Sequence, residues 1–231
     1  MQSIQTVSEN TIYVGASDRR LAKFENLFPI PRGVSYNAYV ILDEKTALLD
    51  TADASVGAQF LENVAAALDG RKLDYLIVDH MEPDHAAMIE AVLVRWPDLR
   101  LVVNAKTLPM LKMYFPTDNA AIDDALVVKE GDTLDLGKHK LTFVMAPMVH
   151  WPEVMMTFDT TTGTLFSADA FGTFGALEGA LFADEVDFAG KWLDDARRYY
   201  TNIVGKYGVQ VQAVLCLLYT SDAADEEDSV D

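Results

Sequence analysis

The sequence predicts an α/β domain with mixed sheets, in which helices lie outside two packed sheets. Three observations lead to this prediction. Strand-like and helix-like segments alternate along the chain, several strand-like segments are joined by short turns as in hairpins, and neither a repeat nor a linker interrupts residues 1–215. The 231 residues are 50% hydrophobic and 23% charged, which is the composition of an ordinary globular protein.

The first third of the chain reads as short strands followed by a helix. The strand segments are rich in β-branched and aromatic residues and cover 11–16, 35–42 and 45–51. A helix is predicted over Asp53–Leu68 because apolar residues recur there with a spacing of about four. Gly70 is expected to end that helix.

The remainder continues the alternation of strands and helices. A continuous apolar run, LDYLIVDH, ends on charged residues, which suits a buried strand whose end opens into a site. Helices are predicted over Ala86–Trp96, Thr107–Phe115 and Phe188–Ile203. Further β-structure is predicted over 99–105, 125–147, 154–160 and 164–170.

Charge and hydropathy exclude several classes of protein. The net charge of −18, from 18 basic and 36 acidic residues, argues against a nucleic-acid partner or an anionic membrane. No apolar run approaches the roughly 18 residues that would span a bilayer. The first ten residues, MQSIQTVSEN, lack the features of a secretory signal, so a cytoplasmic location is expected.

Residues 216–231 differ in composition from the rest of the chain. They hold the single cysteine, Cys216, and six acidic residues, with no Lys or Arg. The string CLLYTSDAADE resembles a translated sequencing adapter, which predicts that 216–231 is a non-native tail and that the natural sequence is interrupted near Leu215. The alternative is a genuine acidic, disordered C-terminus.

The segment Val78–His85 carries the strongest chemical signal. His80, Glu82, Asp84 and His85 fall within six residues, after an apolar strand and before a helix. Two imidazoles and two carboxylates are good donors for a divalent transition metal. The alternative is a polar turn with Asp84 capping the next helix, but a cap leaves the other three residues unexplained.

Two later residues that could bind a metal also follow predicted strands. His150 lies in APMVHWPE and Asp169 in LFSADAFG. Singly, each suits a structural role; together with the first segment they indicate a metal centre built at strand ends. The remaining histidine, His139, is expected to be a surface residue on a strand.

These motifs resemble the metallo-β-lactamase superfamily and, within it, the flavodiiron (A-type flavoprotein) reductases of oxygen and nitric oxide. The superfamily pattern is H-x-H-x-D-H, and Glu82 stands where the second histidine is usual, as in the flavodiiron branch. Segments SYNAYVILDEKTALLDT, SADAFGTFGAL and LFADEVDF extend the resemblance across essentially all of residues 1–215. It implies an αββα sandwich that is incomplete at the C-terminus.

The resemblance also implies a ligand set and a reaction. One iron would be held by His80, Glu82 and His150, a second by Asp84 and His85, with Asp169 bridging the two. Carboxylate is a harder donor than imidazole and suits iron that becomes ferric. The implied reaction reduces O₂ to water or NO to nitrous oxide, with electrons delivered through FMN from the partner in a head-to-tail homodimer. A rubredoxin-like protein or another donor would supply the electrons.

The sequence departs from the family pattern in two ways. The family has a further histidine on the second iron, whereas residues 170–231 contain none. No segment resembles the flavodoxin-like FMN domain that follows in the family. Two alternatives therefore stay open: a binuclear zinc hydrolase of the same fold, and a non-catalytic metal-binding fragment.

Overall fold

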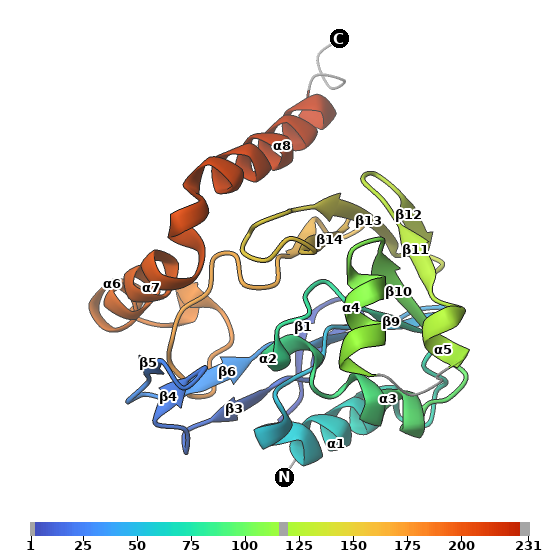
Figure 1. The fold of residues 1–231 in the computed structure, drawn as a ribbon, viewed down its shortest axis with the longest axis horizontal. Helices are drawn as coiled ribbons and strands as arrows, with labels where there is room; N and C mark the ends of the chain where they lie inside the picture. Colours follow the sequence, from blue (N-terminus) through green and yellow to red (C-terminus); the bar gives the residue numbers. More distant parts are fainter. Residues whose placement is uncertain (1–2, 116–119, 227–231) are drawn as a thin grey trace.

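Two sheets face each other in the computed structural model of this chain (Figure 1), which describes residues 3–115 and 120–226, with side chains as far as residue 218. The larger sheet has seven strands in the order β1-β2-β7-β8-β9-β10-β11, and the smaller has four in the order β12-β13-β14-β15. Strands β8, β9, β10 and β11 run parallel to one another, and the other pairings are antiparallel. The predicted mixed α/β architecture is confirmed.

The strands are short, as the sequence predicts. The larger sheet comprises β1 (Gln5–Ser8), β2 (Thr11–Tyr13), β7 (Tyr39–Leu42), β8 (Thr46–Leu49), β9 (Tyr75–Ile77), β10 (Arg100–Asn104) and β11 (Leu126–Val128). The smaller comprises β12 (Thr133–Asp135), β13 (Lys140–Met145), β14 (Met155–Asp159) and β15 (Thr164–Phe166). Two small ribbons pair β3 (Ala16–Asp18) with β6 (Val34–Tyr36), and β4 (Lys23–Phe24) with β5 (Phe28–Pro29).

Helices connect and flank these strands. They are α1 (Gly57–Leu68), α2 (Pro83–Ala86), α3 (Ile89–Arg95), α4 (Thr107–Tyr114), α5 (Ala120–Asp123), α6 (Phe188–Lys191), α7 (Leu193–Tyr199) and α8 (Gly208–Glu226). Short helical turns are η1 (Ala54–Val56), η2 (Ala183–Glu185), η3 (Tyr200–Val204) and η4 (Gly205–Tyr207). No helix of the described part has the length and apolar character needed to cross a membrane.

The central strands are apolar throughout because both faces of the larger sheet are covered. On β8, Leu48 packs in the core beneath the helices, whereas its neighbour Leu49 packs in the core between the sheets. On β9, Leu76 likewise packs in the core beneath the helices and Ile77 in the core between the sheets. Successive side chains of a strand point to opposite faces, so a run with no polar alternation is what two covered faces require.

The predicted helix after residue 52 forms with a distinct first turn. The Asp53 side chain accepts a 2.7 Å hydrogen bond from the backbone N–H of Ser55 and caps η1, after which α1 continues to Leu68. Asp69 and Gly70 both adopt left-handed φ angles, of 46° and 81°, and stop the helix there.

Two predicted helices are broken. Of the helix predicted over Ala86–Trp96, Ala86 is the last residue of α2, which begins earlier at Pro83, and Ile89–Arg95 form α3 after a two-residue turn. The helix predicted over Phe188–Ile203 is divided at Trp192 into α6 and α7 and ends in the π-helical turn η3. At the break, the Trp192 ring packs against Gly175, where an added Cβ atom would lie only 2.6 Å from the ring atom Cζ3. The guanidinium carbon of Arg32 lies over the same ring, 4.2 Å from its centroid. Tertiary packing therefore overrides the local helical pattern.

The prediction that His139 lies at the surface is wrong. It precedes β13 and is only 1% exposed, and its Nδ1 lies 2.8 Å from Oδ2 of the equally buried Asp159. The buried Asp159 carboxylate is a partner for Nδ1 alone, since Nε2 is buried without a partner among the described residues, and local alternation could not reveal this burial. Among the described residues, His139 belongs to none of the candidate metal-binding groups.

Candidate metal centre

The six predicted ligands come from four loops and helix starts that meet at one end of the sheets. His80 and Glu82 lie in the loop after β9, and Asp84 and His85 lie on α2, which Pro83 begins. His150 lies between β13 and β14, and Asp169 follows β15. All six residues are at most 9% exposed. The alternative role of Asp84 as a helix cap is not observed, because it lies within α2 and makes no capping hydrogen bond.

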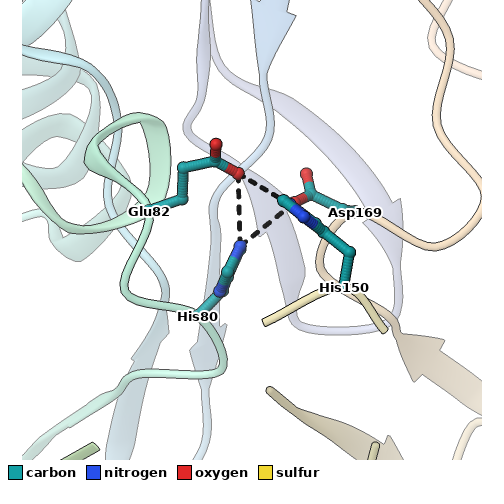
Figure 2. A group of neighbouring side chains, drawn as sticks. All are labelled: His80, Glu82, His150 and Asp169. Carbon is teal, nitrogen blue, oxygen red and sulfur yellow. Dashed lines mark hydrogen bonds and ion pairs between the residues drawn. The ribbon is translucent and has the colours of Figure 1, made fainter. Parts of the chain in front are cut away.

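The first group comprises His80, Glu82, His150 and Asp169 (Figure 2). Glu82 Oε2 lies 3.3 Å from His80 Nε2 and 2.8 Å from His150 Nε2. Asp169 Oδ2 lies 3.2 Å from His80 Nε2 and 3.0 Å from His150 Nε2. Two imidazole nitrogens and two carboxylate oxygens thus converge on one point.

The second group comprises Asp84, His85 and Asp169. Asp169 Oδ1 lies 3.0 Å from His85 Nε2, and Asp84 Oδ2 lies 3.8 Å from the same nitrogen. Asp169 therefore presents one oxygen to each group. A carboxylate placed in this way can bridge two metal ions.

Buried carboxylates orient two of the three imidazoles by hydrogen bonding to Nδ1, the ring nitrogen that faces away from the cluster. Glu153 Oε1 lies 2.8 Å from His80 Nδ1 and accepts a hydrogen bond from the backbone N–H of Met81. Asp50 Oδ2 lies 2.9 Å from His85 Nδ1, and its Oδ1 accepts from the N–H of Asp79. An imidazole held through Nδ1 in this way keeps Nε2 facing the centre, which is the arrangement of metal-binding histidines.

The cluster shifts the pKa values of its members strongly. Burial alone would lower the pKa of His150, but hydrogen bonds to Asp169 and Glu82 raise it to about 9. Burial raises the pKa of Asp84 to about 7, and the charges of Asp169 and Glu82 add to this effect. Burial would raise the pKa of Asp169, but the charge of His85 and hydrogen bonds from the three histidines hold it well below the usual range.

These shifts predict how the metal-free chain responds to pH. A folded pKa near 9 for His150, above its ordinary 6.5, gives stability that is present below pH 6.5 and is lost as pH rises through 9. The raised pKa of Asp84 acts in the same direction between about pH 4 and 7. We expect the thermal midpoint of the chelator-treated chain, measured by circular dichroism, to fall steadily from pH 6 to 9. A midpoint that rises over this interval would contradict the assignment, and His150→Gln should flatten the slope.

The metal-free cluster leaves a polar atom without a partner. Asp84 Oδ1 is buried and has no hydrogen-bond partner among the described residues. Burying an unpaired carboxylate oxygen is unfavourable, and coordination of a cation removes the penalty. The donor set of imidazoles and carboxylates, both hard or intermediate, fits iron. The residues present therefore fit the pair of metal ions that the family resemblance implies.

A cavity of about 720 Å³ reaches the cluster and is bordered there by Asp84, His85 and Asp169. Aromatic side chains, among them Tyr36 and Trp192, also line it. The second group is therefore open to a small molecule, whereas His80 is fully buried.

Two supporting residues are absent from the sequence predictions. Asp50 directly follows β8, the strand beside β9, and its position after a strand was a usable signal. Tyr199 lies on α7, and its hydroxyl donates a 2.7 Å hydrogen bond to Asp169 Oδ1. No local pattern marks Tyr199, because packing alone brings α7 to Asp169.

We expect Tyr199→Phe to weaken metal binding by about 10–100-fold, the usual cost of losing an outer partner of a ligand. The hydroxyl holds Asp169 Oδ1, so its loss frees the bridging carboxylate to rotate. The measurement is a titration of the metal-free chain with Co²⁺. The control is Tyr200→Phe on the neighbouring, exposed tyrosine, whose affinity should stay unchanged. Equal affinities for both variants would show that Tyr199 does not position Asp169.

Two packed sheets, flanking helices and a histidine–carboxylate cluster at the strand ends define the metallo-β-lactamase fold. A family model described as "ODP family beta lactamase" matches residues 34–203. The chain belongs to this family.

Characterised relatives point to the flavodiiron branch. The chain is 37% identical over 200 residues to a "Nitric oxide reductase" of Moorella thermoacetica, with 86% of this chain and 49% of that protein covered. It is 38% identical over 202 residues to an "Anaerobic nitric oxide reductase flavorubredoxin" of Klebsiella pneumoniae, covering 86% of this chain and 40% of that protein. The chain thus spans half or less of the length of these relatives.

Solved structures of flavodiiron proteins have the same fold as this chain. Rubredoxin oxygen:oxidoreductase from Desulfovibrio gigas superimposes with a TM-score of 0.87 at 31% identity, over 95% of this chain and 54% of that one. The flavodiiron protein from Giardia intestinalis gives a TM-score of 0.86 at 26% identity, over 95% and 52%. The predicted resemblance to flavodiiron proteins is confirmed.

Proposed function

We propose that this chain is the di-iron domain of a flavodiiron reductase that converts O₂ to water, NO to nitrous oxide, or both. The observation that carries the proposal is the position of Asp169, whose two oxygens face two separate groups of buried histidine and carboxylate ligands. His80, Glu82 and His150 would hold one iron, and Asp84 and His85 the other, with Asp169 shared between them.

The protein residues prepare this centre in three ways. Glu153 and Asp50 hold the imidazoles of His80 and His85 with Nε2 inward. Tyr199 holds Asp169 between the two groups. The cavity beside Asp84 and His85 admits a small substrate to the second group.

When bound, the two irons would supply electrons and a template for a diatomic substrate. The acidic ligands suit ferric iron after electrons have left, which favours iron over zinc at a centre that contains Glu82. Glu82 accepts from His150 and His80 in the metal-free chain, and these contacts keep its carboxylate pKa lowered against the effect of burial. It is thus held ionised for coordination.

The chain spans about half of its relatives, so the rest of the system is part of the proposal. We propose that electrons reach the centre through FMN on a flavodoxin-like domain outside residues 1–215, placed by a head-to-tail homodimer. A rubredoxin-like donor would reduce that flavin. The proposed location is the cytoplasm. Residues 216–231 are proposed to be a non-native tail. Helix α8 (Gly208–Glu226) continues across residue 215 into this tail, and the side chains from residue 219 onward lie outside the described part.

The test is to load the chain anaerobically with Fe²⁺, count the iron after desalting, and follow NO and O₂ consumption with chemically reduced FMN. Two irons per chain and formation of nitrous oxide or water would support the proposal. One iron and no gas consumption would instead indicate a metal-binding fragment. Preferential retention of two zinc ions with hydrolytic activity would indicate a zinc hydrolase.

A further inference from the structure

The loop between β13 and β14, residues 146–154, forms one side of the first ligand group. Its residue His150 is a member of that group, and the side chain of Glu153 lies 2.8 Å from His80 Nδ1. The ring of Trp151 lies edge-on to both imidazoles, with its centroid 5.3 Å from that of His80 and 6.1 Å from that of His150. Three residues of this loop therefore set the place of two of the four ligands.

The ligands of the first group come from both sheets (Figure 2). His80 and Glu82 lie in the loop after β9 of the larger sheet. His150 and Asp169 lie after β13 and β15 of the smaller sheet. A bound metal tolerates a spread of only about 0.2 Å in its ligand distances, so the loops of the two sheets must be held in a fixed relation. Within the described part of the chain, no residue hydrogen-bonds to His150 Nδ1, so this imidazole depends on the placement of its loop.

Asn104, the last residue of β10, connects loop 146–154 to the larger sheet. Its Nδ2 donates a 2.5 Å hydrogen bond to the backbone carbonyl of Glu153. Its Oδ1 accepts from the backbone N–H groups of Lys106 and Thr107 at the start of α4, at 2.9 and 3.1 Å. Asn104 is only 5% exposed. A buried amide with partners at both ends has one orientation, so it fixes the loop against the end of β10.

A second contact joins the same two parts of the chain. Lys106 Nζ donates a 3.0 Å hydrogen bond to the carbonyl of Pro152, the residue before Glu153. The carbonyls of two consecutive loop residues are thus both held from the end of β10 and the start of α4. The second ligand group has no member on this loop.

We propose that Asn104, assisted by Lys106, is a positioning residue for the first metal position. It acts through Glu153, whose carbonyl it holds and whose carboxylate orients His80, and through the loop that carries His150. This inference rests on the proposed two-metal centre and deepens it, because the affinity of one position then depends on a contact that lies outside both ligand groups. The second position should not respond to the loss of this contact.

Asn104→Asp separates the contact with the loop from the contact with α4. Aspartate has the same size and keeps an oxygen for the N–H groups at the start of α4, but it has no N–H group to donate to the carbonyl of Glu153. Lys106→Met removes the second contact at an exposed position, where substitution has little effect on folding. The matched control is Asn202→Asp, because the exposed Asn202 also donates from Nδ2 to a backbone carbonyl, that of Arg198.

The experiment titrates the metal-free parent and each metal-free variant with Co²⁺ and records the dissociation constants and the visible absorption of the bound ion, which reports its coordination. His150→Gln and His85→Gln assign the two equivalents, since each removes a ligand of one group only. We expect Asn104→Asp to weaken the equivalent at the first position about tenfold, the lower limit for partners outside the ligands, and to change its spectrum. Lys106→Met should weaken the same equivalent less, and Asn202→Asp should match the parent.

Parent-like binding at the first position in both Asn104→Asp and Lys106→Met would overturn the positioning role and leave the proposed function intact. Equal weakening of both equivalents would also overturn it, because a general loss of folded structure does not select one position. If circular dichroism shows that Asn104→Asp does not fold, the result for Lys106→Met decides.

Two further outcomes separate this role from the proposed function. A parent that takes up one Co²⁺, which Asn104→Asp still weakens, would support the positioning role and overturn the two-metal function. Two equivalents with a selective loss at the first position, but no gas consumption by the iron-loaded parent, would support the positioning role and overturn the reductase function.

Discussion

Replacing Asp169 by Asn is expected to reduce the affinity for both metal ions by more than about 100-fold and to abolish the proposed gas reduction. Asp169 is shared by the two ligand groups and faces each with a separate oxygen. The amide has one carbonyl oxygen and no charge, so it cannot replace the second anionic donor. The loss should exceed the 10–100-fold typical of outer partners. Metal content after desalting and NO consumption by the iron-loaded chain measure the two effects.

The matched control is Asp124→Asn, which changes a carboxylate whose side chain is 83% exposed. This variant should retain both ions and the parent rate. An Asp169→Asn chain that still retained two ions would show that Asp169 does not bridge the groups. The folded state can be compared in the absence of metal, where circular dichroism should show the same secondary structure for both variants.

Truncation of Phe143 to Ala is expected to lower the free energy of unfolding by about 3–5 kcal/mol. Phe143 lies on β13, is fully buried, and packs in the core between the two sheets with residues such as Leu49 and Ile77. Removing the ring leaves a cavity where side chains of both sheets meet, and neighbouring strands can close it only partly. Urea unfolding of the metal-free chain measures the change.

Phe182→Ala provides the comparison, because Phe182 is 41% exposed and lies outside both cores. Its loss should change the free energy of unfolding by less than about 1 kcal/mol. A cost for Phe143→Ala as small as that for Phe182→Ala would mean that the sheets do not depend on this contact. A changed slope of the urea transition would instead indicate an altered unfolded state.

Much of the fold was predictable because it is encoded in local periodicity. The i, i+4 pattern of Asp53–Leu68 yields α1, and the apolar run before His80 yields β9 buried on both faces. The division of Phe188–Ile203 was not predictable, since the pattern there is helical and the break depends on the packing of Trp192 against Gly175.

The sequence by itself determined the candidate metal-ligand residue types and their place at strand ends, since these depend on short spacings after apolar runs. His80, Glu82, Asp84 and His85 are recognisable within six residues. Only the tertiary structure decided which oxygen of Asp169 faces which group, and that the Tyr199 hydroxyl reaches Asp169. The physical reason is distance along the chain: contacts between remote segments follow from how the sheets and hairpins pack, and no local period records them.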